Sequence, residues 1–197
     1  VGNNVGIREA KGKYILLLNS DTKVNINTLN MMVNFMEKDG RMGAATCKLE
    51  LGSGELDQAC HRGMPTPCNA LTYMLGLEKL FPHSHLFGGY HQGWKDYSVP
   101  HEVDTISGAF FMIPRKVIDM VGLFDESFFM YGEYIDWCYR IRQAGYKVMF
   151  NPEVMTVHYK KQSGRRQDRD RDLRKRTQNM FMETMKINQQ KQVSNIP

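Results

Sequence analysis

The stretch KYILLLNSDT, from Lys13 to Thr22, decides the fold class of this chain. An unbroken apolar run, Tyr14 to Leu18, lies between Gly12 and the polar group Asn19-Ser20-Asp21. A run without polar alternation predicts a strand buried on both faces, and such strands belong to parallel sheets flanked by helices. In open α/β sheets, ligands bind at the carboxyl ends of the strands. The polar residues that end the run therefore form a candidate ligand site.

The residues after this run predict a helix and a second strand. Apolar residues at helical spacing predict a helix that begins near Asn25 or Asn27 as N-cap and stops at Gly40, and a strand over residues 42–51 follows. Strand, helix and strand in this order suggest a right-handed βαβ unit. The sheet then needs partner strands that residues 1–13 do not supply, so we expect an α/β sheet, mostly parallel, that lacks its first strands.

The rest of the chain alternates between weak and strong patterns. Residues 52–102 predict a long excursion over the active face, with one helical piece near 71–80. The later elements are a strand over 109–113, a short helix with Pro114 as its first residue and its end at Gly122, a helix over 133–144, and two short strands, 146–150 and 153–159.

Composition excludes several classes of protein. The 197 residues are 42% hydrophobic and 24% charged, which is typical of a globular domain. No apolar run approaches the roughly 20 residues that cross a bilayer, and no segment reads as a signal peptide, so we expect a cytoplasmic protein. Four cysteines are too few for a disulfide scaffold, and plain reduced thiols are favoured over a zinc site at Cys60, His61 and Cys68.

The positive charge is concentrated in one segment. Residues 160–176 hold nine Lys or Arg and three Asp, whereas the whole chain has a net charge of +5. The remainder is nearly neutral, which argues against a nucleic-acid surface on the folded part. We expect a domain over residues 1–163 and a basic helical tail over 164–197. Two interpretations of this tail stay open: contact with the inner, anionic face of a membrane, and a solvated charged helix.

Three segments together carry a family resemblance. They are NNVGIREAKGKYILLLNSDT, VDTISGAFFMIPRKV, and GLFDESFFMYGEYIDWCYRIRQAGYKVMFNPEVMTVHYKKQS. The chain resembles the family 2 glycosyltransferases of the GT-A fold, particularly the rhamnosyltransferase-like members, from Gly2 to about Ser163. Family members usually begin with a strand and an Asp-rich turn that do not appear here, which supports an N-terminally truncated fragment.

The resemblance implies a divalent metal site for Mn²⁺ or Mg²⁺. NSDT stands where the family carries its Asp-x-Asp motif, so Asp21 is implied as a ligand and Asn19 replaces the first carboxylate. His158 matches the family's Val-x-His position, and an imidazole ligand suits Mn²⁺ better than Mg²⁺. Such an ion can neutralise the diphosphate that leaves from a nucleotide-sugar.

The resemblance also implies a catalytic carboxylate at the start of the helix over 133–144. The family has Glu-Asp at positions 133 and 134, and its Asp acts as general base, but position 134 here is Tyr. A phenol with an ordinary pKa of about 10 is a poor base at neutral pH. Glu133 and Asp136 lie on one helical face and are the candidate catalytic residues. Tyr134→Asp is expected to raise transfer if the missing base impairs the natural protein.

Further residues are implied to bind substrate through their match to family motifs. They are Asn3, Asn4, Asn19, Asp104, Ser107, Gly108 and Tyr134. The partners so implied are a dTDP- or UDP-sugar donor and a glycan or lipid-linked acceptor. The predicted function is inverting glycosyl transfer, with rhamnose as the candidate sugar, and two alternatives are left open. These are a non-catalytic sugar-binding relative, which Tyr134 favours, and a nucleotidyltransferase.

Overall fold

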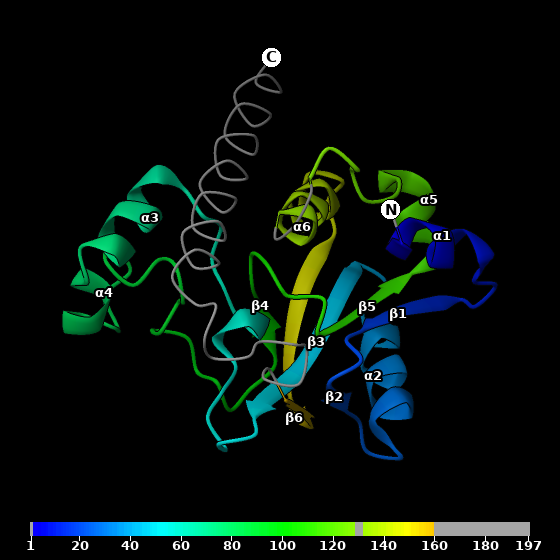
Figure 1. Ribbon diagram of the computed structural model, residues 1–197, viewed down its shortest axis with the longest axis horizontal. Helices are drawn as coiled ribbons and strands as arrows, with labels where there is room; N and C mark the ends of the chain where they lie inside the picture. The colour runs from blue at the N-terminus through cyan, green and yellow to red at the C-terminus, as the bar shows by residue number, and fades with distance from the viewer. Residues whose placement is uncertain (1, 129–131, 160–197) are drawn as a thin grey trace, which may run out of the picture.

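The computed structural model describes residues 2–128 and 132–159, which form one six-stranded mixed sheet with helices packed on it (Figure 1). The basic tail predicted over residues 164–197 lies outside the described residues. The elements, in chain order, are α1 (Gly2–Glu9), β1 (Tyr14–Leu18), β2 (Thr22–Lys23), α2 (Thr28–Glu37), β3 (Met42–Leu51), η1 (Gln58–Cys60), α3 (Pro67–Met74), α4 (Leu77–Leu80), β4 (His101–Glu102), β5 (Phe110–Pro114), α5 (Arg115–Val121), α6 (Glu133–Gln143) and β6 (Lys147–His158).

The strand order is β1-β5-β3-β6-β2, and β4 pairs with β6. β5 is antiparallel to both β1 and β3, whereas β3 and β6 are parallel. The three strands β1, β3 and β6 therefore run in one direction, and β5 is inserted between two of them in reverse. The α/β fold class is confirmed, but the prediction of a mostly parallel sheet is wrong, because among the described strands only β3 and β6 pair in parallel. The two strands of the predicted βαβ unit, β1 and β3, are parallel in one sheet, with β5 between them.

The prediction that Tyr14–Leu18 is buried on both faces is also wrong. Only Ile15 is fully buried, and Leu18 is 40% exposed. Within the described residues β1 is the outermost strand, so its side chains have neighbours on one flank only. Every residue of β5 is buried instead. The apolar run correctly located a strand, but the most buried position in the sheet belongs to Phe110–Pro114.

The last strand differs from its prediction in a way that matters for the site. One strand, β6, replaces the two short strands expected, and its pairing with β3 shifts between Asn151 and Met155. Pro152 lies at this irregularity, where the interrupted pairing does not need a backbone N–H to donate a hydrogen bond between strands. Beyond it the pairing resumes and ends with His158 opposite Leu51. The carboxyl ends of β3 and β6 therefore meet at the same edge of the sheet.

Helix ends account for the other small differences. The helical piece expected near 71–80 is two helices, α3 and α4, separated at Gly76, whose φ of 71° is left-handed and favours glycine. Pro114 is the N-cap of α5 and not its first residue. Asn27 occupies the N-cap of α2 but makes no side-chain capping bond, and Thr28 Oγ1 accepts from the Asn25 N–H instead. α2 and α6 both pack on β3 and β6.

Candidate active site

The NSDT turn is held against two strands at one edge of the sheet. The Asn19 N–H and the Thr22 hydroxyl both donate to the Ala109 carbonyl, at 3.3 and 3.1 Å. The Asp21 carbonyl accepts from the Tyr159 N–H at 2.8 Å, and Thr22 pairs with His158 across β2 and β6. The backbone at Asp21 is therefore fixed beside the end of β6.

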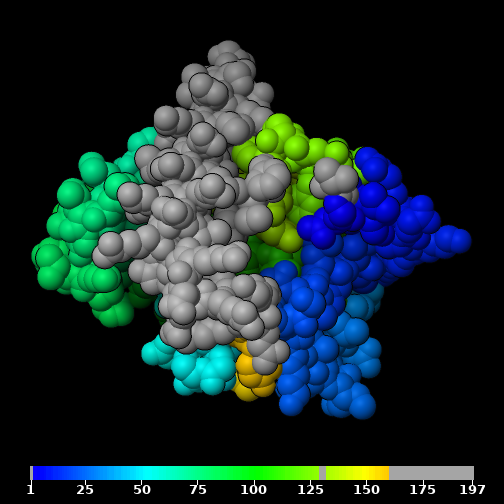
Figure 2. Space-filling model, in the orientation of Figure 1, coloured from blue at the N-terminus to red at the C-terminus, as the bar shows by residue number. Residues whose placement is uncertain are grey.

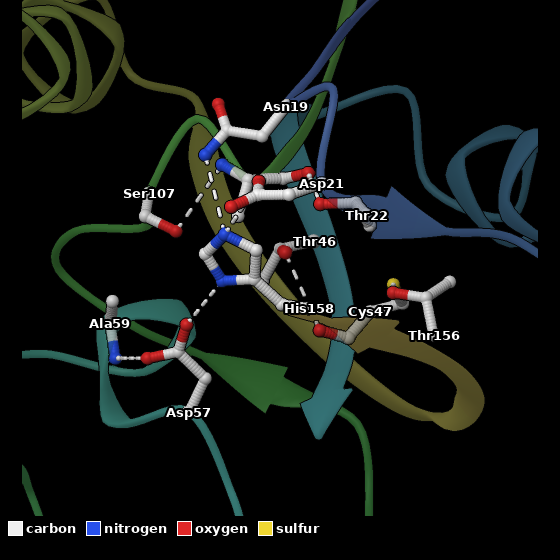
Figure 3. Close-up of polar contacts among 11 residues, drawn as sticks. Asn19, Asp21, Thr22, Thr46, Cys47, Asp57, Ala59, Ser107, Thr156 and His158 are labelled. Carbon is white, nitrogen blue, oxygen red and sulfur yellow. Dashed lines mark hydrogen bonds and ion pairs between the residues drawn. The ribbon is translucent and has the colours of Figure 1, made fainter. Parts of the chain in front are cut away.

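The side chains of Asp21 and His158 converge, as the family resemblance predicted. Asp21 Oδ1 lies 3.2 Å from His158 Nε2, and the two side chains are 8% and 7% exposed. The amide nitrogen of Asn19 lies 3.4 Å from the same ring nitrogen. In Figure 3 the ring of His158 lies between Asn19 and Asp21 on one side and Asp57 on the other. Asp21 Oδ1 and His158 Nε2 therefore face each other at the strand ends.

Asp57 also belongs to this site, although no motif in the sequence singles it out. Its carboxylate Oδ2 accepts from His158 Nδ1 at 2.7 Å, and its Oδ1 accepts from the Ala59 N–H at 3.0 Å (Figure 3). The residue is completely buried. Asp57 precedes η1 as its N-cap, so the only local signal is a capping pattern inside the weakly patterned segment 52–102.

The Asp21–His158 pair has the geometry of two neighbouring metal ligands. Two ligand atoms about 2.1 Å from one ion and at right angles to each other lie about 3 Å apart, close to the observed spacing. Among residues 2–128 and 132–159, no group of three or more His, Cys, Asp or Glu is arranged to hold an ion. Ions at phosphate-transfer sites commonly take one or two protein ligands and complete their shell with substrate oxygens and water. The pair fits that type of site.

The two carboxylates at the start of α6 have different environments. Glu133 Oε2 is buried and has no hydrogen-bond partner among the described residues. Asp136 is buried and its Oδ2 accepts from Arg140 Nε at 2.8 Å. Arg140 also donates to the carbonyls of Val121, the last residue of α5, and Leu123, two residues further on. Asp136 thus holds an arginine that ties α6 to the end of α5 and the loop after it, whereas Glu133 Oε2 has no hydrogen-bond partner among the described residues.

Tyr134 fills the position where the family has its catalytic Asp. Its ring packs edge-on against Phe124 and tilted against Phe111, with centroids 5.1 and 5.9 Å away. Burial raises the pKa of its phenol. A Cβ at Gly108 would lie 2.0 Å from Tyr134 Oη, so only glycine admits the ring there. The residue after Gly108 is Ala109, whose carbonyl accepts a hydrogen bond from the Asn19 N–H of the NSDT turn. Tyr134 therefore connects the start of α6 to that turn through the backbone of residues 108–109.

The remaining residues of the predicted substrate set have these positions. Asn3 donates to Tyr134 Oη at 3.3 Å, and the Ser107 hydroxyl accepts from the Ala109 N–H at 3.4 Å. Asn4 is buried and exchanges hydrogen bonds with the backbone of Phe124. Asp104 pairs with Arg142 at 3.0 Å and accepts from the Met64 N–H and the Gln92 amide, away from the strand ends. The structure brings Asn19, Asp21 and His158 together and leaves Asn4 and Asp104 in contacts of their own.

The cysteines do not form part of this site. All four are free thiols, and burial raises the pKa of Cys47, Cys60 and Cys138 to about 12. Buried His61 instead faces His101 and the carbonyl of His91.

Comparison with known proteins supplies the family. A profile described as "Glycosyltransferase like family 2" matches residues 2–181. The chain belongs to this family. The match covers nearly all of the sequence, and it confirms the resemblance drawn from the three motif segments.

Two relatives are similar to this family 2 chain at low identity. The low-salt glycan biosynthesis hexosyltransferase Agl10 of Haloferax volcanii is 26% identical over 161 residues, which cover 80% of this chain and 47% of Agl10. The rhamnosyltransferase WbbL of Escherichia coli is 25% identical over 166 residues, covering 80% of this chain and 59% of WbbL. The chain thus spans about half the length of these curated relatives.

A solved structure supports the fold. The crystal structure of GalNAc-T7 with UDP, GalNAc and Mn²⁺ aligns with a TM-score of 0.54 and 18% identity, over 80% of this chain and 29% of that one. At this identity the likeness concerns the fold alone. It confirms the GT-A fold that the resemblance implied.

Proposed function

We propose that this protein is an inverting glycosyltransferase that moves a hexose from a nucleoside diphosphate donor to a glycan or lipid-linked acceptor. The observation that carries the proposal is the Asp21–His158 pair, 3.2 Å apart and nearly buried at the edge of the sheet where β6 ends. This is where α/β sheets bind ligands, and the pair has the spacing of two metal ligands. Asp21 and His158 would hold a divalent cation, Mn²⁺ or Mg²⁺, whose charge would offset that of the departing diphosphate.

We assign the general base to Glu133. The acceptor hydroxyl gives its proton to the Glu133 carboxylate, and its oxygen attacks the anomeric carbon. The bond to the diphosphate breaks on the opposite face, so the configuration inverts. The buried Oε2, which has no hydrogen-bond partner in residues 2–128 and 132–159, supports this role, because a buried carboxylate oxygen without a hydrogen bond is costly unless a ligand supplies one. We assign Asp136 to positioning, since Arg140 already occupies its Oδ2.

The donor sugar follows from the relatives only as a proposal. WbbL is named a rhamnosyltransferase and Agl10 a hexosyltransferase, so dTDP-rhamnose and UDP-hexoses are the first donors to test. The alternative of a non-catalytic sugar-binding relative is favoured by Tyr134, which puts a packed aromatic ring at the family's base position. Donor binding without transfer would support that alternative.

A membrane surface is the proposed location of the acceptor. Among the described residues, large exposed apolar side chains gather in and around α3 and α4, a lobe that projects from one side of the molecule (Figure 2). They are Leu71, Tyr73, Met74, Leu75, Leu80, Phe81 and Leu86. Apolar side chains that insert at the interface, together with the basic segment 160–176, are the combination that favours anionic lipid. Among residues 2–128 and 132–159, no helix has the length and apolar character needed to cross a bilayer.

The test is a transfer assay with the purified chain, a panel of dTDP- and UDP-sugars, and Mn²⁺ or a chelator. Glu133→Gln should lower the transfer rate about 10²- to 10⁴-fold, the usual contribution of a general base, with little change in donor KM. Asp119→Asn on α5 is the matched control, because it removes an exposed carboxylate. Transfer that persists in Glu133→Gln would exclude Glu133 as the base, and transfer unaffected by chelation would exclude the metal.

A further inference from the structure

We infer that Asp57 is a positioning residue that sets the tautomer of His158 and thereby leaves Nε2 free to bind the metal. This inference rests on the metal site of the proposed function. Asp57 lies 101 positions from His158 in the chain, is completely buried, and bonds the ring nitrogen opposite the one that faces Asp21. Metal-binding histidines commonly donate their other ring N–H to a carboxylate, which fixes the ring's orientation and tautomer.

The two oxygens of Asp57 have separate partners. Oδ1 accepts from the Ala59 N–H and Oδ2 from His158 Nδ1. An ionised carboxylate only accepts hydrogen bonds, and Asp57 Oδ2 lies 2.7 Å from Nδ1 whereas Asp21 Oδ1 lies 3.2 Å from Nε2. The amide nitrogen of Asn19, which can only donate, lies 3.4 Å from Nε2, so we place the proton of a neutral His158 ring on Nδ1. The lone pair of Nε2 then points toward Asp21 and Asn19. That lone pair is the one a metal ion needs.

The backbone holds Asp57 where this bond can form. The Asp57 N–H donates to the Leu49 carbonyl at 2.8 Å, and its own carbonyl accepts from the Cys60 N–H at 3.0 Å. Leu49 belongs to β3, whose last residue, Leu51, is paired with His158 on β6. The position of Asp57 relative to His158 is therefore fixed by the register of the two parallel strands.

Asp57→Asn tests the tautomer directly, because the asparagine side chain has one oxygen in place of the two of aspartate. The Ala59 backbone N–H can only donate, so the amide oxygen must stay with Ala59. The amide NH₂ then faces His158 Nδ1, which can accept only if the ring proton moves to Nε2. The variant keeps the shape of the site but places a hydrogen on the nitrogen proposed to bind metal.

The structure offers a matched control at Glu78. Its carboxylate also accepts from one backbone N–H and one histidine Nδ1, both from His91, at 2.8 and 2.9 Å. Glu78→Gln therefore makes the same chemical change on a buried side chain that has no contact with Asp21 or His158 among the described hydrogen bonds. A general effect of losing a buried carboxylate should appear in both variants, whereas loss of metal should appear only in Asp57→Asn.

The experiment combines ring-nitrogen NMR with Mn²⁺ titration followed by electron paramagnetic resonance. In the wild-type chain at pH 8.5, long-range ¹H–¹⁵N spectra should show the His158 proton on Nδ1, and in Asp57→Asn on Nε2. Mn²⁺ should bind Asp57→Asn about 10- to 100-fold more weakly than wild type, and Glu78→Gln with wild-type affinity. A proton on Nε2 in the wild-type chain would overturn the inference even if Asp57→Asn fails to fold. Equal Mn²⁺ affinity of Asp57→Asn and wild type would overturn it as well.

The outcomes also separate this inference from the proposed reaction. If Mn²⁺ binds the wild-type chain and Asp57→Asn weakens it, the inference stands even when no donor is consumed, and only the reaction is lost. If the wild-type chain binds no Mn²⁺, the proposed metal site is wrong, and the inference about Asp57 is wrong as well.

Discussion

Replacing Tyr134 with aspartate restores the carboxylate that the family has at this position, but the structure predicts that the protein loses stability. The ring of Tyr134 packs on Phe111 and Phe124 and lies against Gly108. Removing a buried aromatic side chain typically costs about 3–5 kcal/mol, and partial exposure of this one places it near the lower end. The new carboxylate would also lie beside Glu133. We therefore expect the free energy of unfolding to fall by about 3 kcal/mol.

The assay is thermal unfolding followed by circular dichroism, with Tyr134→Phe as the control. About 3 kcal/mol corresponds to a fall in Tm of roughly 6–12 °C for a chain of this size. Tyr134→Phe keeps the ring and loses only the 3.3 Å hydrogen bond from Asn3, which is exposed, so it should cost less than about 1 kcal/mol. If Tyr134→Asp unfolds at the wild-type temperature and transfers sugar faster, the packing role assigned to Tyr134 is wrong.

Three further predictions concern packing, thiol reactivity and pH. Gly108→Ala should destabilise the chain by about 1–3 kcal/mol, because its Cβ would lie 2.0 Å from Tyr134 Oη; urea unfolding should show Tyr134→Leu relieving much of this loss, and additive costs would contradict the clash. In the native chain, Cys68 is exposed and should react with a disulfide reagent first, whereas the three buried thiols, whose pKa is raised to about 12, should react only on unfolding; four equal rates would disprove this. Burial lowers the pKa of His61 from 6.5 to about 3, so between these values the unfolded chain binds a proton that the folded chain does not. The free energy of unfolding should therefore fall on acidification by up to about 1.4 kcal/mol per pH unit, and His61→Phe should flatten this dependence; an identical slope in both proteins would refute it.

Local patterns were enough to predict most of the elements. The apolar run located β1 at Tyr14–Leu18, and the pattern of residues 42–51 located β3. The helix that begins at Glu133 was predicted to within a residue of its end. These elements are predictable because strand and helix periodicity, and stops such as Gly122 and Gly145, are properties of neighbouring residues. The stop expected at Gly40 is wrong by three residues, because α2 ends at Glu37.

Part of the candidate site could also be predicted. The match to family motifs singled out Asp21 and His158, and the structure confirms that their side chains converge. It could not separate Glu133 from Asp136, since both lie on the same helical face. The difference arises from the hydrogen bond between Asp136 and Arg140, and from how Arg140 reaches the loop after α5.

The sequence by itself determined where β1, β3 and α6 lie, because those elements depend on local spacing. Only the tertiary structure decided that β5 separates β1 from β3, that the irregularity at Pro152 brings His158 opposite Leu51, and that Asp57 bonds the far side of the His158 ring. Asp57 and His158 lie 101 positions apart. Their contact depends on the register of two paired strands, and a slip of one residue would turn His158 to the other face of the sheet. No periodicity within either segment carries that information.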